Sequence, residues 1–459
     1  MSLDVKVNIP KNANTIIHIL ESNGHEAYVV GGCVRDFILG REPNDWDICT
    51  SATPAEMLEI FKDKQIIETG LQHGTVTVVI DGEPYEVTTY RIDGIYSDNR
   101  RPDSVAFTDS LAEDLKRRDF TINAMAYNNK TGLVDPYGGL KDLQHKYLRC
   151  VGSPKERFEE DALRILRAVR FAAQLGFRID PDTENEAYIQ RDRLNNISVE
   201  RINSEFCKII NSNNFGMMLF LHVDLFSVFI PEIRHLKFSP YEGIEDLFAL
   251  ATYSILNCER YAYIEADMIT KLAVMFCDIG KYKTYLCDST GSCSEYSAEI
   301  TDEVMRRLRF DNDTREKVIE LVYHHSDTIT DDKVCVKKWL NKIGEEQFRR
   351  MISLRMARMI DAEYLNPTSF ELIDIGISKM FRVQELVNRV IENKECYSLK
   401  DLAVNGNDLI ALGYYEPGKK LGKILNELLL LVIEGAKNDK DVLLDLAQRM
   451  YENRNVKYK

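Results

Sequence analysis

Two spacings of apolar residues follow one another along the chain. In the first third, short runs of β-branched and aromatic residues stand between segments whose apolar residues recur every three or four positions. After about Lys155 only the helical spacing continues. The pattern therefore predicts an α+β head with a small mixed sheet, followed by an all-α remainder.

Turn signals separate the elements of the head. A helix is predicted from Asn12 to Ser22, because Gly24 follows it as a natural C-terminal cap. The other elements predicted for the head are a strand at 27–30, a helix at 34–39, a strand at 45–49, a helix at 54–61, and a hairpin of strands 75–80 and 85–90 that turns at Asp81 and Gly82.

The longest helical pattern of the remainder runs from Glu156 to Leu175 and is ended by Gly176. Further helices are predicted at 247–258 and 268–276. A final unit begins near Ser398, and the apolar stripe of its helix is predicted to be core rather than a partner surface. The stripe consists of Leu421, Ile424, Leu425, Leu428, Leu429, Val432 and Ile433.

Composition narrows the class of protein. The chain has 459 residues, of which 44% are apolar, and 59 Lys and Arg face 73 Asp and Glu, for a net charge of −14. These values exclude a disordered or collagen-like chain and predict roughly three globular units. The most apolar stretch, 217–230, contains His222 and Asp224 and is too short to cross a bilayer, so no membrane partner is expected. The ten cysteines form no C-x-x-C pair, which predicts free thiols in a reducing cytoplasm.

Two neighbouring features suggest chemistry on a phosphorylated substrate. Asp45 and Asp47 would point to the same face of a strand, with Trp46 pointing into the core. Paired carboxylates repel unless a divalent cation lies between them, and oxygen-only ligation suits Mg²⁺. Glu86, on the second strand of the hairpin, would supply a third carboxylate for a site with two metals.

A glycine pair precedes these acids by about ten residues. Gly31 and Gly32 lie between a strand and a helix start, where a close backbone approach and free N–H groups favour phosphate oxygens, and Arg35 adds a fixed charge. A tight structural turn is the alternative for the glycines alone. The glycines and the acid pair together indicate a triphosphate site beside a metal site.

Four motifs, taken in order, resemble a known family. They are Gly31-Gly32-x-Val34-Arg35-Asp36, Asp45-x-Asp47, Arg117-Arg118-Asp119-Phe120-Thr121-Ile122-Asn123-Ala124, and Glu160-Asp161-x-x-Arg164. With these motifs the chain resembles the class II tRNA nucleotidyltransferases, the CCA-adding enzymes. Bacterial poly(A) polymerases share the head of this family. The resemblance is specific over about residues 25–175 and looser to the end of the chain.

The resemblance implies a nucleotidyltransferase-fold head, followed by a helical neck, body and tail, which we place at 1–145, 146–215, 216–390 and 391–459. It implies that Asp45, Asp47 and Glu86 are the catalytic acids and that Asp45 and Asp47 bind Mg²⁺ as cofactor. It implies nucleotide-binding roles for Gly31, Gly32, Arg35, Arg118, Asp119, Asn123, Glu160, Asp161, Arg164, Arg167 and Arg170. Within these, Glu160 would orient Arg164, while Arg118, Asp119 and Asn123 would meet the ribose.

The chemistry of base edges gives Asp161 and Arg164 a specific use. Cytosine and adenine both present an amino donor beside a ring-nitrogen acceptor, which a carboxylate and a guanidinium match. Uracil and guanine would set acceptor against acceptor, and unpaired groups of that kind can discriminate by about 10⁴ or more. The alternative is an ordinary intrahelical ion pair at i, i+3, worth about 0.2–0.5 kcal/mol.

The expected reaction is attack of a tRNA 3′-hydroxyl on the α-phosphate of CTP or ATP, with pyrophosphate leaving and no nucleic-acid template. The segment from Arg91 to Asp103 resembles the family's flexible loop, which favours complete CCA addition. A poly(A) polymerase, an enzyme that adds only A, and a catalytically silent RNA-binding protein remain as alternatives.

Two further features lie outside the head. Cys277-Asp278, with His324 and His325, resembles a metal-dependent phosphohydrolase (HD) signature whose histidine is replaced by Cys277, so we expect a structural domain without hydrolase activity. The stretch from Lys333 to Arg358 is strongly basic and is either a solvated helix face or an RNA-binding surface. Two interpretations also remain for a second group of lysines near the C-terminus, which lie either at an ordinary capped helix start or in contact with an RNA phosphate: Lys419, Lys420 and Lys423.

Overall fold

The computed structural model describes residues 6–94, 105–237, 246–286, 292–365 and 370–456. The chain forms two compact units, Met1–Pro231 and Glu232–Lys459. The predicted boundaries at 145, 215 and 390 subdivide these units and stay predictions. Among the described residues, no helix combines the length and the apolar character needed to cross a membrane.

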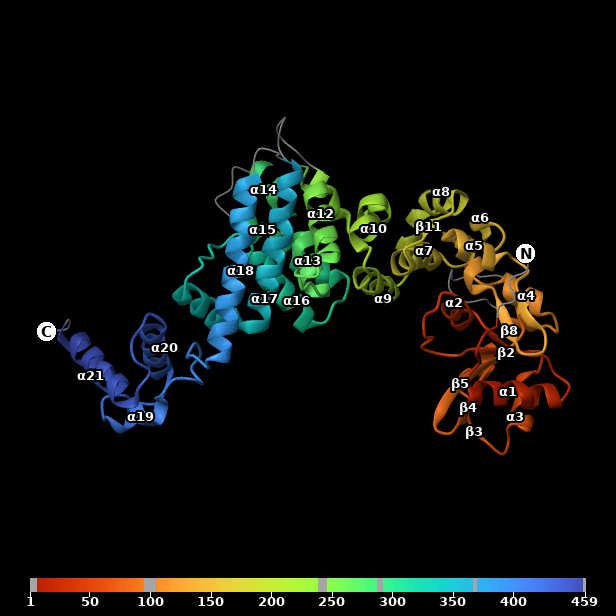
Figure 1. The fold of residues 1–459 in the computed structure, drawn as a ribbon, viewed down its shortest axis with the longest axis horizontal. Coiled ribbons are helices and arrows are strands. Elements are labelled where there is room, and N and C mark those ends of the chain that lie inside the picture. Colours follow the sequence, from red (N-terminus) through yellow and green to blue (C-terminus); the bar gives the residue numbers. More distant parts are fainter. Residues whose placement is uncertain (1–5, 95–104, 238–245, 287–291, 366–369, 457–459) are drawn as a thin grey trace. The chain divides into compact units, whose positions relative to one another are not determined.

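A mixed seven-stranded sheet lies in the first unit (Figure 1). Its strands are β1 (Ala27–Val30), β2 (Ile48–Thr50), β3 (Gln65–Ile67), β4 (Thr75–Ile80), β5 (Glu83–Thr89), β8 (Ala126–Asn128) and β9 (Gly132–Val134). Their spatial order is β3-β4-β5-β2-β1-β8-β9. Strands β2 and β5 run parallel, and the other neighbouring pairs are antiparallel. This arrangement confirms the predicted α+β head.

Helices and short strand pairs complete the first unit. The helices are α1 (Lys11–Ser22), α2 (Gly32–Ile38), α3 (Pro54–Ile60), α4 (Leu111–Lys116), α5 (Gly139–His145), α6 (Pro154–Glu160), α7 (Leu163–Leu175), α8 (Pro181–Ile189), α9 (Val199–Ile210), α10 (Phe215–Leu221) and α11 (Val223–Phe229). The strand pairs are β6 (Arg91–Asp93) with β7 (Val105–Phe107), and β10 (Tyr147–Leu148) with β11 (Arg178–Ile179). Helix α3 begins where predicted because Thr53 and Glu56 form a capping box.

A small apolar core holds the sheet against α4. Tyr28 and Val30 of β1 share one face of the strand and pack with Leu111 and Leu115 of the helix. Tyr90, which is fully buried, belongs to the same cluster. The core therefore fixes the end of β1 and the start of the 117–119 segment relative to one another, and both carry candidate site residues.

Two predicted elements are wrong in their extent. The strand predicted at 45–49 begins only at Ile48, so Asp45 and Asp47 lie in the loop before it and Trp46 is half-buried rather than in the core. The helix predicted at 156–175 is divided at Asp161, whose φ of −144° and ψ of 102° are those of extended backbone. Both departures concern candidate site residues.

The described part of the second unit is helical. Its helices are α12 (Leu247–Arg260), α13 (Met268–Phe276), α14 (Lys281–Leu286), α15 (Cys293–Arg307), α16 (Asn312–His324), α17 (Lys333–Leu365), α18 (Phe370–Glu392), α19 (Gly406–Ala411), α20 (Lys419–Ile433) and α21 (Lys440–Val456). Helix α17 is broken at Gly344, whose φ of 79° is a conformation that glycine adopts without strain. The all-α remainder is thus confirmed.

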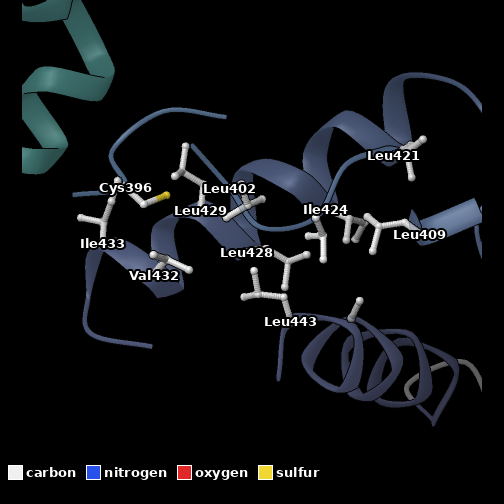
Figure 2. Close-up of a cluster of buried hydrophobic side chains, with 12 residues drawn as sticks. Cys396, Leu402, Leu409, Leu421, Ile424, Leu428, Leu429, Val432, Ile433 and Leu443 are labelled. Atoms are coloured by element: carbon white, nitrogen blue, oxygen red, sulfur yellow. The ribbon is translucent and has the colours of Figure 1, made fainter. Parts of the chain in front are cut away.

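The predicted stripe of α20 is core. Figure 2 shows Leu421, Ile424 and Leu428 pointing into a cluster that also contains Leu409 of α19 and Leu443 of α21. The packing unites the helices that follow Ser398 into one small hydrophobic core. Lys419, Lys420 and Lys423, at the start of the same helix, are exposed.

Residues of the second unit pair with the basic stretch of α17. Lys333 and Lys337 both bind Glu395, and Lys338 binds Glu434. The other contacts are Lys342 to Asp327, Arg349 to Glu345, Arg350 to Asp267 and Glu346, Arg355 to the carbonyl oxygen of Asp327, and Arg358 to Asp278. The stretch is therefore mainly an internal ion-pair network, which weakens its interpretation as an RNA-binding surface.

Cations surround the carboxylate of the HD-like segment. Asp278 is 2% exposed and contacts Arg358 at 2.7 Å and Lys281 at 3.0 Å. Burial alone would raise the pKa of Asp278, but these two cations hold it well below its ordinary value. Burial raises the pKa of the neighbouring Cys277 thiol to about 12, which disfavours the thiolate that a metal requires. The contacts are those of a structural ion pair, and the structural role expected for this domain stays a prediction.

Replacing Arg358 with methionine is expected to lower the free energy of unfolding by about 3 kcal/mol, because the buried Asp278 would keep only one of its two cationic partners. Urea denaturation of the full chain measures this loss. The exposed pair of Arg382 and Asp331 provides the control, since Arg382→Met should change stability little. Equal losses from the two variants would contradict a structural role for the Asp278 cluster.

Candidate active site

The glycine pair forms a tight turn at the end of β1. Gly31 has a φ of 82°, and its N–H donates to the carbonyl oxygen of Met125 at 3.0 Å. A Cβ atom at Gly31 would lie 2.8 Å from Nη1 of Arg118, so the guanidinium group occupies the space that a side chain would need. Gly32 opens α2, and a Cβ there would make ordinary contact with Arg35. The turn thus brings Arg118 against backbone that leads into a helix N-terminus.

Backbone pairing places the three candidate acids beside this turn. The carbonyl oxygen of Asp47 accepts the N–H of Val30 at 3.0 Å, which extends the β1–β2 ladder by one residue. The parallel register of Ile48 with Val87 places Asp47 level with Glu86 on β5. Asp45, Asp47 and Glu86 all reach the surface. The acids are therefore accessible to a ligand.

The pKa of Asp47 is raised from 3.8 to about 6. Although Asp47 reaches the surface, desolvation of its carboxylate by neighbouring protein atoms is the first cause, followed by the charges of Asp45 and Glu86, while Arg118 acts in the opposite direction. These acids therefore lie close enough to repel one another, and the positive charge of Arg118 does not fully offset that repulsion. An oxygen-only donor set of this kind fits a divalent cation. Within the described ranges, however, no three Asp, Glu, His or Cys side chains form a ready-made metal cluster.

A chain of hydrogen bonds connects α7 to the head. Asp119 accepts from Nε of Arg167 at 2.9 Å and from Nδ2 of Asn123 at 3.1 Å. Asn123 in turn accepts from Nη1 of Arg35 at 2.6 Å, and Arg35 binds Asp36 through two further nitrogens. Burial opposes ionisation of Asp119, but Arg167 and Asn123 keep its pKa well below the ordinary value. This network brings together four of the predicted nucleotide-binding residues.

Asp114 is a site residue that sequence reasoning missed. Its side chain is 1% exposed, and it pairs with Arg117 at 2.7 Å and with Arg118 at 3.5 Å. It also accepts the N–H of Arg91. The helical spacing of Asp114 with the two arginines, at i+3 and i+4, was a readable signal. Asp114 positions Arg118 against the glycine turn.

Asp161 terminates α6 and begins the turn into α7. One carboxylate oxygen accepts the N–H of Leu163 at 3.0 Å, and the other accepts from Nη2 of Arg201 at 2.8 Å. The first contact resembles a helix cap, and the second joins the turn to α9. These two contacts account for the helix break. Arg201 was not found from the sequence, because it lies forty residues away in the chain.

Arg164 has partners different from those of Asp161. Its Nη1 contacts Glu160 at 2.5 Å, and its Nη2 donates to the carbonyl oxygen of Arg117 at 3.0 Å. The contact with Glu160 is the one expected if Glu160 orients Arg164. Because Arg118 follows Arg117 and lies against Gly31, the backbone of 117–118 connects the Asp161–Arg164 turn to the glycine turn.

Arg170 is more enclosed than its predicted role suggests. It is 8% exposed and lies 3.1 Å from Glu205 of α9. Burial lowers its pKa, and Glu205 acts against that shift. The structure therefore gives Arg170 a supporting contact between α7 and α9.

A polar pocket of about 580 Å³ lies next to the network. Arg35, Asp36 and Phe171 line it, together with Arg41, Glu42, Asn44, the end of α7 and residues 211–214. Asn44, which is next to Asp45, is part of this wall, whereas the three acids, Asp161 and Arg164 are not among the residues that line it. The pocket borders the site on the side of the C-terminal end of α7.

The glycine turn, the candidate acids and the arginine network all lie in the first unit, most of them in a stretch that matches a known head domain. Residues 27–149 match the model of the poly A polymerase head domain, 176–236 that of a probable RNA and SrmB-binding site of polymerase A, and 292–447 that of a putative tRNA nucleotidyltransferase domain 2.

The chain is 36% identical to a CCA-adding enzyme of Lacticaseibacillus paracasei, over 99% of this chain and 100% of that protein. It is 49% identical to a CCA-adding enzyme of Oceanobacillus iheyensis over 46% of this chain and 53% of that protein. A crystal structure of the Bacillus stearothermophilus CCA-adding enzyme in complex with CTP matches with a TM-score of 0.70 and 27% identity, covering 98% of this chain and 100% of that one. The chain belongs to the family of CCA-adding enzymes, and it is a nucleotidyltransferase.

Proposed function

We propose that this chain adds C, C and A to the 3′ end of tRNA from CTP and ATP, without a nucleic-acid template, and releases pyrophosphate. The observation that carries the proposal is the turn at Asp161, where a carboxylate and a guanidinium group are held by separate partners. Such a pair matches the amino group and ring nitrogen that cytosine and adenine share. Family membership over nearly the whole chain supports the same function.

We assign three groups of residues to the reaction. The glycine turn with Arg35 holds the triphosphate, and Arg118, Asp119 and Asn123 position the ribose. Asp45 and Asp47 would hold Mg²⁺, and Glu86 completes the catalytic acids; when bound, the metal would neutralise charge that develops on the phosphate oxygens. The RNA 3′-hydroxyl displaces pyrophosphate from the α-phosphate directly, so no covalent intermediate on the protein is needed.

Nucleotide incorporation separates this proposal from its alternatives. The full chain is incubated with tRNA that ends before CCA and with tRNA that ends in CC, using CTP and ATP singly and together. Two additions with CTP, and one further addition with ATP, would support CCA synthesis. Long A tracts regardless of CTP would instead identify a poly(A) polymerase, and A added only to the CC end would identify an A-adding enzyme. The predicted loop from Arg91 to Asp103 lies largely outside the described residues, so the assay decides this point.

Replacing Arg201 with glutamine is expected to raise the KM for CTP and ATP by roughly tenfold, because Asp161 would lose a charge-assisted hydrogen bond that fixes its orientation. The preference for CTP over UTP should fall as well. Steady-state incorporation with each nucleotide measures both effects. Arg193→Gln is the matched control, since Arg193 lies in the same region and pairs with Glu159, at 3.9 Å, rather than with Asp161. The same rise in KM from the control variant would contradict the role given to Arg201.

A further inference from the structure

One aromatic ring lies among three arginines of the site. The guanidinium carbon of Arg170 is 4.1 Å from the ring centroid of Phe171, that of Arg35 is 5.1 Å away, and that of Arg167 is 5.4 Å away. All three distances fall within the range of a cation–π interaction. Phe171 is only 7% exposed, so water screens these contacts weakly.

The three arginines come from two parts of the first unit. Arg167 and Arg170 belong to α7, as Phe171 does, whereas Arg35 belongs to α2 of the head. The ring also meets Phe120, which directly follows Asp119, at a centroid distance of 5.8 Å and an interplanar angle of 80°. Phe171 therefore touches the head through two independent contacts.

Two of the three arginines bind predicted nucleotide-binding residues. Arg35 donates to Asn123, and Arg167 donates to Asp119. The side chain of Arg167 is still 32% exposed, so one side of it faces solvent. Three like charges near one another would repel, and the negative face of an aromatic ring reduces that repulsion without competing for their hydrogen bonds.

We propose that Phe171 is a positioning residue for nucleotide binding: its π face holds Arg35 and Arg167 in the orientation in which they support the ribose and triphosphate groups of CTP and ATP. The inference rests on the proposed function, because it assigns the residue to the same nucleotide site. Phe171 itself need not touch the substrate.

Fluorinated phenylalanines test the proposal with little change of shape. Mono-, di- and trifluorinated phenylalanine at position 171 withdraw electron density from the ring in steps and leave its packing nearly intact. The KM for CTP and for ATP should rise with each step, to roughly tenfold for the trifluorinated ring, with a smaller change in kcat and none in the KM for tRNA. Phe171→Leu should show a similar loss of nucleotide affinity, and Phe171→Tyr should restore it in part.

Phe158 provides the matched control. It is fully buried in α6, and among the described residues no guanidinium group lies over its ring. The same fluorinated series there should leave both nucleotide KM values unchanged. A flat series at position 171, or equal rises at both positions, would overturn the inference. A wild-type chain that fails to extend tRNA with CTP and ATP would instead contradict the proposed function, so the two failures are distinguishable.

Discussion

Asp47→Asn is expected to lower the rate of nucleotide incorporation by roughly a thousandfold or more, with little effect on tRNA affinity. The substitution keeps the size of the side chain and the β1–β2 pairing, because that pairing uses the backbone of Asp47. It removes a carboxylate that Asp45 and Glu86 repel, and with it a proposed ligand for the divalent cation. Single-turnover incorporation of CTP into tRNA that ends before CCA measures the effect.

Two comparisons show whether the loss is chemical. Asp63→Asn changes an exposed acid elsewhere in the head and should leave the rate unchanged.

The stability of the metal-free protein gives a second readout, because a raised pKa means that ionising Asp47 destabilises the folded state. This destabilisation is absent below the ordinary pKa of 3.8 and complete above about 6. Asp47→Asn should therefore raise Tm at pH 8 and leave it unchanged at pH 3. A lower Tm at pH 8, or full activity, would contradict the acid site.

Elements set by local signals were predictable from the sequence. The hairpin of β4 and β5 turns at Asp81 and Gly82, both of which adopt positive φ, and β1 has the predicted bounds. The apolar stripe of α20 could be assigned to a core because its spacing matches one helix face. In these cases the residues that determine the structure lie within a few positions of one another.

The break at Asp161 could not be predicted in the same way. Apolar residues keep helical spacing on both sides of it. The sequence pattern therefore shows one continuous helix, although the backbone leaves the helical conformation at Asp161. The contact that stabilises the extended conformation comes from Arg201 on another helix. Likewise, the cations of α17 pair with acids such as Glu395 and Glu434, whose proximity depends on the tertiary fold. A single sequence shows charge but not the distant partner that neutralises it.

The candidate site was predictable as a set of residues and less so as an arrangement. The glycines, acids and arginines were chosen from motifs, and the structure connects most of them through Arg118, Asn123 and the backbone of Arg117. Asp114, Arg201 and Phe171 were missed because they act on other site residues. Their roles become visible only when hydrogen bonds and ring contacts are traced through the fold.

Asp161→Ala is expected to reduce kcat/KM for CTP and ATP by about a hundredfold or more and to change that for UTP and GTP much less. If the carboxylate meets the base as we propose, it accepts from the amino group of cytosine or adenine and repels the carbonyl oxygen of uracil or guanine. Its removal then takes away an attraction for one pair of bases and a repulsion for the other. Arg164 keeps its contacts with Glu160 and with the backbone of Arg117, which preserves the rest of the turn.

Competition between CTP and UTP for the same tRNA measures this loss of discrimination directly. Asp182→Ala removes an exposed acid from α8 and is the control, for which the ratio of CTP to UTP incorporation should not move. If Asp161→Ala lowered the incorporation of all four nucleotides by one common factor, the carboxylate would be acting only through its contacts with Leu163 and Arg201. A selective fall for CTP and ATP requires that it also meets the base, because neither of those structural contacts distinguishes one nucleotide from another.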